Sequence, residues 1–378
     1  MAIDKITTAS ITDANITTAK LAYDAIAFRN IIINGDMSIA QRATSVSGIT
    51  NASGDVFVND RFCWAESGSM TSTFTMSQVT DVPTGQGFAK SLKLDCTATD
   101  TPATTERIRI ETRFEGQNLQ YLKKGTANAE SWTISFWVKS VKTGTYIVNF
   151  RDEDNARIVS KAYTISSANT WEKKTVTVAP DTTDPFDNDN AHSLTVAWIL
   201  SAGSSLQSGS LADVWQDYAN ANYAAGQVNF ADSTSNEFYL TGVQLEAGTT
   251  ASDFEFLPFD VNRQRCYRYY RTLVPLNTEN TGFSMGFYTA NNNGRFAMHL
   301  ENPMRTTPTL DIVTGTDYFK IFTAGGGDDE LNSFSIMANS TERFVIANNT
   351  SQASGTGGQA GYVQSSSNSA YLGLEAEL

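Results

Sequence analysis

Residues that commonly hold metals or form disulfide frameworks are scarce in this chain. Its 378 residues include three cysteines and two histidines. Cys63, Cys96 and Cys266 have no C-x-x-C spacing and cannot all pair within one chain, so we expect buried free thiols. His192 and His299 have neither H-x-x-x-H spacing nor a G-x-S-x-G motif nearby, and we interpret both as structural.

Long apolar runs and basic clusters are also missing. No run of about 18 apolar residues occurs, and the opening MAIDK does not begin an apolar secretion signal. The 27 Lys and Arg are outnumbered by 40 Asp and Glu, which gives a formal net charge of −13. An acidic chain without a Lys/Arg-rich run is poorly suited to bind nucleic acid phosphates or an anionic membrane. We therefore expect no nucleic acid partner, no membrane insertion, and synthesis in a reducing cytoplasm.

The residues that are abundant favour β-structure. The chain has 21 Phe and 14 Tyr against only 8 Pro, and Thr, Ser, Asn and Gly are frequent. This composition is typical of β-rich domains with polar loops, and the length suggests two or three domains. From residue 29 to 258, eight strand-like segments follow one another at a spacing typical of a jelly-roll β-sandwich. They are TSTFTMSQV, KSLKLDCTA, RIRIETRF, WTISFWVKS, GTYIVNFRD, WEKKTVTVA, HSLTVAWIL and EFYLTGVQL.

The segment SWTISFWVKS (131–140) shows how one of these strands should lie. Because side chains alternate between the two faces of a strand, one set should line the core and the other should face outward. The expected core set is Trp132, Ile134, Phe136 and Val138, and the expected outer set is Thr133, Ser135, Trp137 and Lys139. Trp137 is therefore an expected exposed aromatic and a candidate glycan contact.

The first 28 residues carry an aliphatic repeat with a period of five. Its members are Ile6, Ile11, Ile16, Leu21 and Ile26. Neither an α-helix nor a strand places residues five apart on one face, so a single chain cannot bury this pattern. Several copies wound around a common axis can turn every aliphatic residue inward. We interpret 1–28 as an oligomerisation stem, most simply threefold; the alternative is a disordered leader with chance spacing.

Residues 259–272, FDVNRQRCYRYYRT, have the spacing of a short helix, which we expect to link two domains. Arg263, Arg265, Arg268 and Arg271 concentrate positive charge there. Two interpretations remain open. The arginines could dock an anionic sugar, or they could pair with carboxylates of a neighbouring subunit.

Residues 273–378 return to strand patterns and predict a smaller C-terminal β-sandwich. Its turns include AGGGDDE (324–330). No G-K-[ST] follows these glycines, and adjacent carboxylates would repel phosphate, so we expect a flexible tip loop. Asp328 and Asp329 in this loop are candidate glycan contacts.

The stretch VWQDYANANY (214–223) is the strongest candidate for sugar binding within the sandwich. Sugar rings stack on aromatic side chains, while Asn, Gln and Asp bind hydroxyl groups. Trp215, Tyr218 and Tyr223 combine both kinds of group in one predicted loop. In the alternative interpretation, Trp215 closes one end of the sandwich and the tyrosines cover it.

Several of these segments resemble known families. The turn NGDM, SWTISFWVKS and NTWEKKTVTV (169–178) are similar to landmarks of jelly-roll carbohydrate-binding modules. RNIIINGDMSIAQRATS (29–45), VNDRFCW (58–64), YAAGQVNFADSTSNEFYLTGVQLEAGTTASDFEF (223–256) and CYRYY (266–270) resemble tail-fibre and receptor-binding proteins of tailed bacteriophages. The ending, from ENPMRTTPTL (301–310) to AYLGLEAEL (370–378), fits the same group.

This resemblance implies a homotrimeric virion fibre, made in the host cytoplasm, that attaches through its N-terminus to tail or capsid proteins and binds a host surface polysaccharide. Many carbohydrate-binding modules of this shape hold a structural calcium with a carboxylate in the last strand. Here FYLTGVQL carries Thr241 and Gly242 at that place, and the acidic loop DTTDPFDNDN (181–190) lacks the Gly and distal Glu of a hand-type loop. We therefore expect no metal or other cofactor.

No pair of carboxylates predicts a hydrolase. Glu106 and Glu111 are five apart and should face opposite sides of a strand, while Asp152, Glu153 and Asp154 lie in a predicted hairpin turn. We expect a non-enzymatic receptor-binding fibre. The alternatives are a structural head fibre or decoration protein and, third, a polysaccharide-degrading tailspike whose carboxylates meet only in the fold.

The five-residue repeat predicts the assembly state. The purified chain should form a trimer, with a mass by light scattering three times the 41.1 kDa of one chain. A mass of one chain would contradict the prediction. A trimer that survives deletion of 1–28 would show that other regions hold the assembly.

Overall fold

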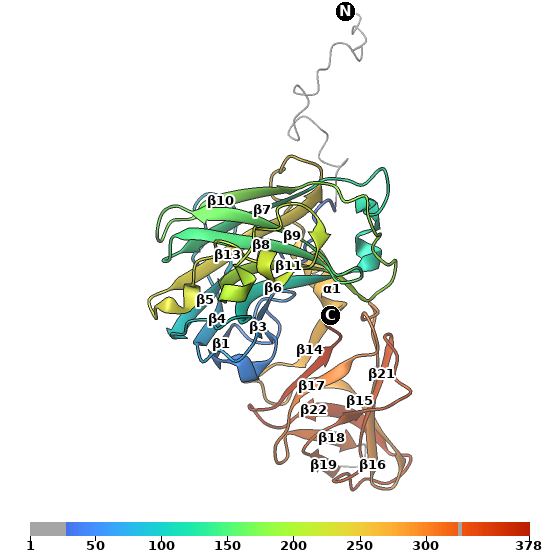
Figure 1. Cartoon of the computed structure of the whole chain (residues 1–378). Coiled ribbons are helices and arrows are strands. Elements are labelled where there is room, and N and C mark those ends of the chain that lie inside the picture. Colours follow the sequence, from blue (N-terminus) through green and yellow to red (C-terminus); the bar gives the residue numbers. More distant parts are fainter. Residues whose placement is uncertain (1–27, 324–326) are drawn as a thin grey trace, which may run out of the picture.

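Strands account for 43% of the structure and helices for 8% (Figure 1). The computed structural model describes residues 28–323 and 327–378. The expected all-β fold with β-sandwiches and one short α-helix is therefore confirmed. The predicted stem, with Ile6, Ile11, Ile16, Leu21 and Ile26, lies outside the described residues.

Two antiparallel sheets pack face to face in the larger domain. The six-stranded sheet has the order β1 (Ser45–Ile49), β4 (Thr73–Val79), β5 (Ser91–Ala98), β13 (Glu237–Ala247), β7 (Trp132–Ser140) and β10 (Glu172–Val178). The seven-stranded sheet has the order β12 (Gln216–Asp217), β9 (Arg157–Ile165), β8 (Gly144–Asp152), β11 (His192–Ala202), β6 (Arg107–Glu115), β3 (Cys63–Ser67) and β2 (Val56–Phe57). The loops contain the 3-10 helices η5 (Asn51–Ser53), η6 (Gly116–Asn118), η7 (Gln120–Leu122), η8 (Ser204–Leu206), η9 (Asn220–Asn222) and η10 (Phe230–Asp232).

The alternation predicted for β7 is confirmed on its inner face. Trp132, Ile134, Phe136 and Val138 are all buried in the core between the two sheets. The outer face differs from the expectation, because it is covered rather than exposed. Trp137 is only half-exposed: it lies beside Gly242, and the ring of Phe88 packs over the same glycine. Gly242 has φ +62°, and a Cβ there would lie 2.6 Å from the Phe88 ring, so the position requires glycine.

The three cysteines are free and buried, as predicted. Burial raises the pKa of the Cys63, Cys96 and Cys266 thiols, which favours the unreactive protonated form.

A separate apolar cluster lies on the outer face of the seven-stranded sheet of the larger domain. The segment 203–231 folds over this face and contributes Leu206 and Tyr223, which pack against Ile147 of β8 and Ile199 of β11. Chain outside the sandwich therefore covers one part of the sheet. The neighbouring part, over β6, β8 and β11, remains open as a cleft.

A fully buried lysine joins the loops at one end of the sandwich. The Lys124 ammonium lies 2.7 Å from Asp152 Oδ2 and 3.2 Å from Asp181 Oδ2. It also donates to the backbone carbonyls of Thr183 (3.1 Å) and Asp184 (2.5 Å). Two carboxylates and two carbonyls thus surround the Lys124 ammonium group, and we call this arrangement the Lys124 cage.

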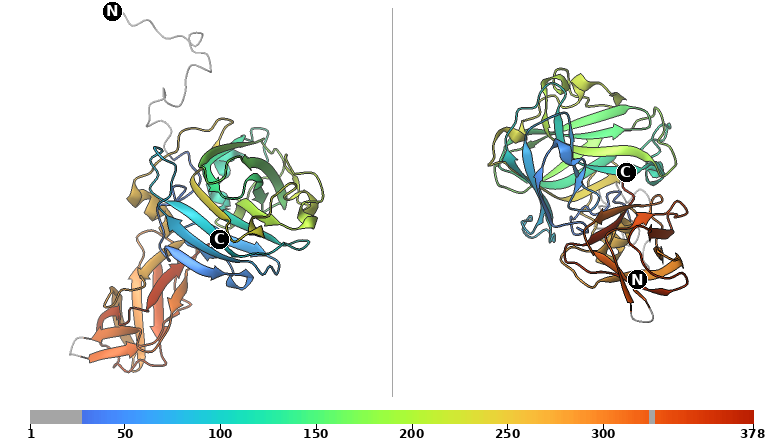
Figure 2. Two further views of the ribbon diagram at one scale, coloured as in Figure 1. Left: turned by 90° about the vertical axis from the view of Figure 1, so that its left-hand side faces the viewer. Right: turned by 90° about the horizontal axis from the view of Figure 1, so that it is seen from below.

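The distal domain is the smaller sandwich that the sequence predicts (Figure 2). Its three-stranded sheet has the order β14 (Tyr270–Val274), β23 (Tyr371–Glu375) and β17 (Thr309–Val313). The seven-stranded sheet has the order β19 (Gly327–Leu331), β18 (Phe319–Thr323), β22 (Ala360–Ser365), β15 (Gly282–Ala290), β16 (Asn293–His299), β21 (Phe344–Asn349) and β20 (Ser335–Ile336). Its core includes the aromatic group Phe283, Phe296, Phe319 and Phe334, whose rings meet edge to face.

Two predictions for this region need correction. The helix α1 spans Phe259–Tyr267 rather than 259–272, because Tyr270–Val274 pair with β23 as β14. Asp328 and Asp329 lie in strand β19, not in a loop. The Asp329 carboxylate is buried and accepts hydrogen bonds from Tyr288 Oη (2.5 Å) and the Ser354 backbone, so it organises the domain interior.

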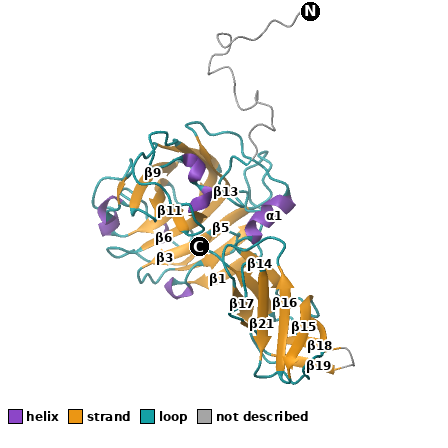
Figure 3. Ribbon diagram, turned by 90° about the vertical axis from the view of Figure 1, so that its right-hand side faces the viewer, coloured by secondary structure: helices purple, strands orange, loops and turns teal. Residues whose placement is uncertain are grey.

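The domains meet where α1 and β14 approach the jelly roll (Figure 3), and β23 pairs with β14. Arg42 lies 3.3 Å from Glu375 and 3.4 Å from Glu377, and Arg61 forms an ion pair with Glu377. Arg268 and Tyr269 both donate to Glu115 at the end of β6. We call this set of contacts the seam.

The Lys124 cage makes a specific prediction about stability. Lys124→Met leaves the buried Asp152 carboxylate without its cation, whereas Asp181 keeps Arg157, so the free energy of unfolding should fall by about 3–5 kcal/mol. Lys123→Met is the matched control, because Lys123 pairs with Glu130 on the exposed surface and should contribute under about 1 kcal/mol. Urea denaturation measures both; similar losses in the two variants would contradict the role assigned to the cage.

Candidate functional site

The open part of the seven-stranded sheet forms a cleft of about 240 Å³. We call it the sheet cleft. Its lining side chains come mainly from the outer faces of β6, β8 and β11, with Tyr223 from the covering segment. They are Arg107, Arg109, Glu111, Arg113, Asn149, Arg151, Glu153, His192, Thr195, Ala197 and Tyr223.

The pairing register explains why a hollow exists there. Ala197 of β11 lies directly between Glu111 of β6 and Asn149 of β8. The next outward-facing row along the strands is Arg113, Thr195 and Arg151. Because the alanine side chain is short, it leaves a hollow between the longer side chains on the two neighbouring strands.

Glu111 carries a fixed negative charge in this cleft. Its carboxylate is buried, forms an ion pair with Arg109, and lies 2.6 Å from Arg113 Nη2. Burial alone would raise the pKa of Glu111, but the charges and hydrogen bonds of the two arginines hold that pKa below its usual value. Glu111 therefore acts as a permanent hydrogen-bond acceptor.

Asn149 is the unusual residue of the sheet cleft. The residue is 1% exposed, and neither its amide nitrogen nor its amide oxygen has a hydrogen-bond partner among residues 28–323 and 327–378. Arg107 Nε is also buried and has no hydrogen-bond partner in the described part of the chain, although Arg107 Nη1 donates to Tyr218 Oη at 3.2 Å. Buried polar groups without partners are rare, and each costs free energy in the folded state.

The candidates from 214–223 separate into two environments. Tyr223 lines the sheet cleft and is 4% exposed, with the Arg107 guanidinium 4.9 Å from its ring centre. Tyr218 packs edge to face on Tyr223, and Arg151 lies 4.9 Å above its ring. Trp215 instead contacts the core residue Trp132, with ring centres 5.3 Å apart. Trp215 thus occupies the position expected if it closes an end of the sandwich.

The remaining sequence candidates lie elsewhere. Trp137 is on the outer face of the other sheet, and Asp328 and Asp329 belong to the distal domain. Sequence reasoning missed Arg107, Arg109 and Asn149. A signal for the two arginines was present, because RIRIETR (107–113) places a charged side chain at every second position and so on one face of a strand. No sequence signal distinguishes Asn149.

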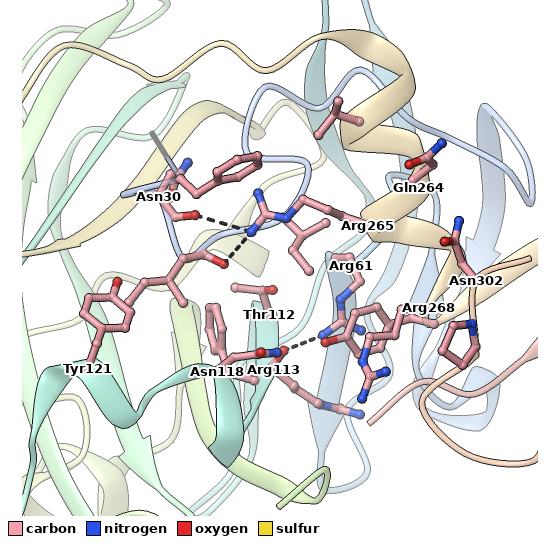
Figure 4. Close-up of a pocket in the computed structure, with 17 residues that line it drawn as sticks. Asn30, Arg61, Thr112, Arg113, Asn118, Tyr121, Gln264, Arg265, Arg268 and Asn302 are labelled. Carbon is pink, nitrogen blue, oxygen red and sulfur yellow. Dashed lines mark hydrogen bonds between the residues drawn. The ribbon is translucent and has the colours of Figure 1, made fainter. Parts of the chain in front are cut away.

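A second, larger hollow of about 480 Å³ lies between α1, the end of β6 and the distal domain (Figure 4). We call it the interdomain pocket. It combines arginines, amides and apolar groups. The lining residues are Phe28, Asn30, Ile31, Ile33, Arg61, Thr112, Arg113, Phe114, Asn118, Tyr121, Val261, Gln264, Arg265, Arg268, Tyr269, Asn302 and Pro303.

The carboxylates of the sheet cleft bear on metal and acid-base chemistry. Residues 28–323 and 327–378 contain no group of three His, Cys, Asp or Glu side chains able to hold a metal ion. Glu111 and Glu153 both line the sheet cleft, so carboxylates distant in sequence do meet there. However, a general acid needs a raised pKa, whereas the pKa of Glu111 is lowered.

No described helix is long and apolar enough to cross a membrane.

No protein-family model matches the sequence, and no curated protein matches it. Solved structures share parts of the architecture at low similarity. The enzymatically active domain of bacteriophage CBA120 tailspike protein 4 is 14% identical, with a TM-score of 0.29 over 58% of this chain and 21% of that chain. A CBM4 structure is 12% identical, with a TM-score of 0.29 over 57% of this chain and 97% of that chain.

A third similar structure is the family 11 carbohydrate-binding module of a Clostridium thermocellum cellulase. It is 10% identical, with a TM-score of 0.27 over 55% of this chain and 97% of that chain. This chain therefore matches about a fifth of the tailspike and nearly all of each carbohydrate-binding module. Likenesses this low leave the function to be argued from the sites themselves.

The charge balance of the sheet cleft predicts the behaviour of His192. Burial and the positive charges of Arg113, Arg61 and Arg151 lower the pKa of His192 from 6.5 to about 4. Between these values the unfolded chain binds a proton that the folded chain does not, so this group should make the fold less stable as the pH falls from 6.5 toward 4.

The His192 prediction can be measured by NMR on protein with labelled histidine. The chain has only two histidines, so His299→Gln identifies the remaining His192 signal. Its titration midpoint should lie near pH 4. A midpoint between pH 6 and 7 would contradict the cationic surroundings described for this ring.

Proposed function

We propose that this chain is a receptor-binding fibre protein of a tailed phage virion, which attaches the particle to its host by binding a surface glycan. The proposed glycan site is the sheet cleft. Binding occurs there without cleavage, and the fibre carries three copies of the chain. The observation that carries the proposal is Asn149, a buried amide with two unpaired atoms facing an open cleft.

An unpaired buried amide suits a sugar because it offers one donor and one acceptor to neighbouring hydroxyl groups. Glu111, fixed as an anion, adds an acceptor beside it, and the Arg107 Nε adds a donor. Tyr223 supplies an aromatic wall at the edge of the cleft. A cleft of about 240 Å³ is small for a ligand site and suits one unit of a longer chain.

The trimer and the virion location rest on different support. The five-residue aliphatic repeat favours several copies of the chain side by side, and the motifs quoted above resemble phage fibre proteins. Three weak sites on one particle bind a polymer far more tightly than one site does, so a small cleft is sufficient for adhesion.

The test replaces Asn149 with leucine, which has a similar size but no hydrogen-bonding atoms. Binding of purified host polysaccharide, measured by calorimetry, should fall roughly tenfold, because about two hydrogen bonds are lost. Stability should stay unchanged or rise, because an unsatisfied buried amide is removed. This combination separates a ligand-binding residue from a structural one.

Asn236→Leu is the matched control. Asn236 is also buried, but its amide donates to Phe230 O and to Asp232, so its replacement should lower the melting temperature. If Asn149→Leu binds the polysaccharide as tightly as the wild-type protein does, the sheet cleft is not the glycan site. Release of reducing ends would favour a hydrolase, and wild-type protein that neither binds host glycans nor competes with virions for cells would favour a structural virion part.

A further inference from the structure

The interdomain pocket contains a guanidinium that lacks a carboxylate partner. Four arginines line the pocket, and none of its lining residues is acidic. Three of the four have carboxylate partners outside it: Arg61 pairs with Glu377, Arg113 with Asp55 and Glu111, and Arg268 with Glu115. Arg265 forms no salt bridge with any residue of 28–323 or 327–378, and the pocket therefore has an excess positive charge.

The contacts that Arg265 does make are weak. Its Nη2 donates to the backbone carbonyls of Asn30 and Ile31, each at 3.4 Å (Figure 4). The charge of Glu255 raises the pKa of Arg265, but both Glu255 carboxylate oxygens already accept hydrogen bonds from the backbone nitrogens of Phe28 and Asn30. Burial lowers the pKa of Arg265, whereas Glu115 raises the pKa of the neighbouring Arg268. A half-buried arginine with only weak contacts to backbone carbonyls can bind the anionic group of a ligand.

The other residues that line the pocket indicate which chemical groups the ligand has besides its anionic group. The amide side chains of Asn118, Gln264 and Asn302 can donate to and accept from hydroxyl groups. Tyr121 is 46% exposed on the pocket rim and offers a ring face. A bare inorganic ion would use neither the amides nor the ring. A volume of about 480 Å³ at a domain boundary is also within the range of organic ligand sites.

We propose that the interdomain pocket binds an acidic sugar unit, whose carboxylate pairs with Arg265 while its hydroxyl groups contact the amides. This site is separate from the sheet cleft; only Arg113 lines both hollows. The inference does not depend on the proposed function, because the pocket could bind an acidic saccharide whatever the sheet cleft does.

The experiment uses the full-length protein and a matched pair of probes. One probe is trigalacturonate; the other is the same trisaccharide after chemical reduction of its carboxyl groups to alcohols. Calorimetry should detect binding of the acidic form, and reduction should weaken it roughly tenfold or more, since a charge-assisted bond is lost. Equal affinity for the two probes, or no binding of the acidic one, would overturn the proposal.

Three variants then locate the site. Arg265→Gln should weaken trigalacturonate binding roughly tenfold. Arg263→Gln is the matched control on the same helix, because Arg263 is exposed beside the Tyr267 ring and does not line the pocket, so affinity should change less than twofold. Tyr121→Ala removes an exposed ring without disturbing the core and should weaken both probes by the same factor.

Two outcomes distinguish this proposal from its competitors. If Asn149→Leu abolishes carboxylate-dependent binding and Arg265→Gln does not, the anion binds in the sheet cleft and the interdomain proposal is wrong. If Arg265→Gln converts the assembly to single chains by light scattering, Arg265 pairs with a carboxylate of another copy, which also overturns the proposal.

Discussion

The ion triad of Arg109, Glu111 and Arg113 connects the sheet cleft with the seam. Glu111 would be a costly buried charge on β6 without its two arginines. The same arginines then extend in different directions. Both arginines line the cleft, and Arg113 also reaches Asp55 and the carbonyl of Leu378, beyond the end of β23. One carboxylate therefore fixes two arginines of the cleft, one of which also contacts the distal domain.

Other buried charges in the chain follow the same rule. Lys124 is enclosed by Asp152 and Asp181, and Glu115 is enclosed by Arg268 and Tyr269. Each set lies where loops or domains meet rather than in the apolar core. A buried ion pair contributes little net stability, because the cost of desolvating the two ions offsets their attraction. However, a paired buried ion tolerates few alternative arrangements. We interpret these networks as interactions that hold the loops in one geometry. Asn149 differs from them, because its amide is buried without a hydrogen-bond partner among the residues that the structure describes.

Local patterns predicted much of the fold and little of the site. Alternation in 131–140 identified the core face correctly, because burial of Trp132 and Ile134 depends mainly on the strand itself. Contacts between distant residues were not predictable in this way. Asp329 is adjacent to a glycine run in sequence, but its role is set by Tyr288 and Ser354. Asn149 looks ordinary in sequence and becomes distinctive only because its cross-strand neighbour is Ala197.

The distal domain is joined to the jelly roll through both of its chain ends. β14 leaves the seam and β23 returns to it as the adjacent strand, so the two connections run side by side. A pull on the far edge of the domain, near β19, loads both strands together along their length. The covalent connection through β14 and the ion pairs that Arg42 and Arg61 form with Glu375 and Glu377 therefore bear this load together. A force on the distal domain should thus reach the jelly roll through two adjacent strands rather than through one single connection.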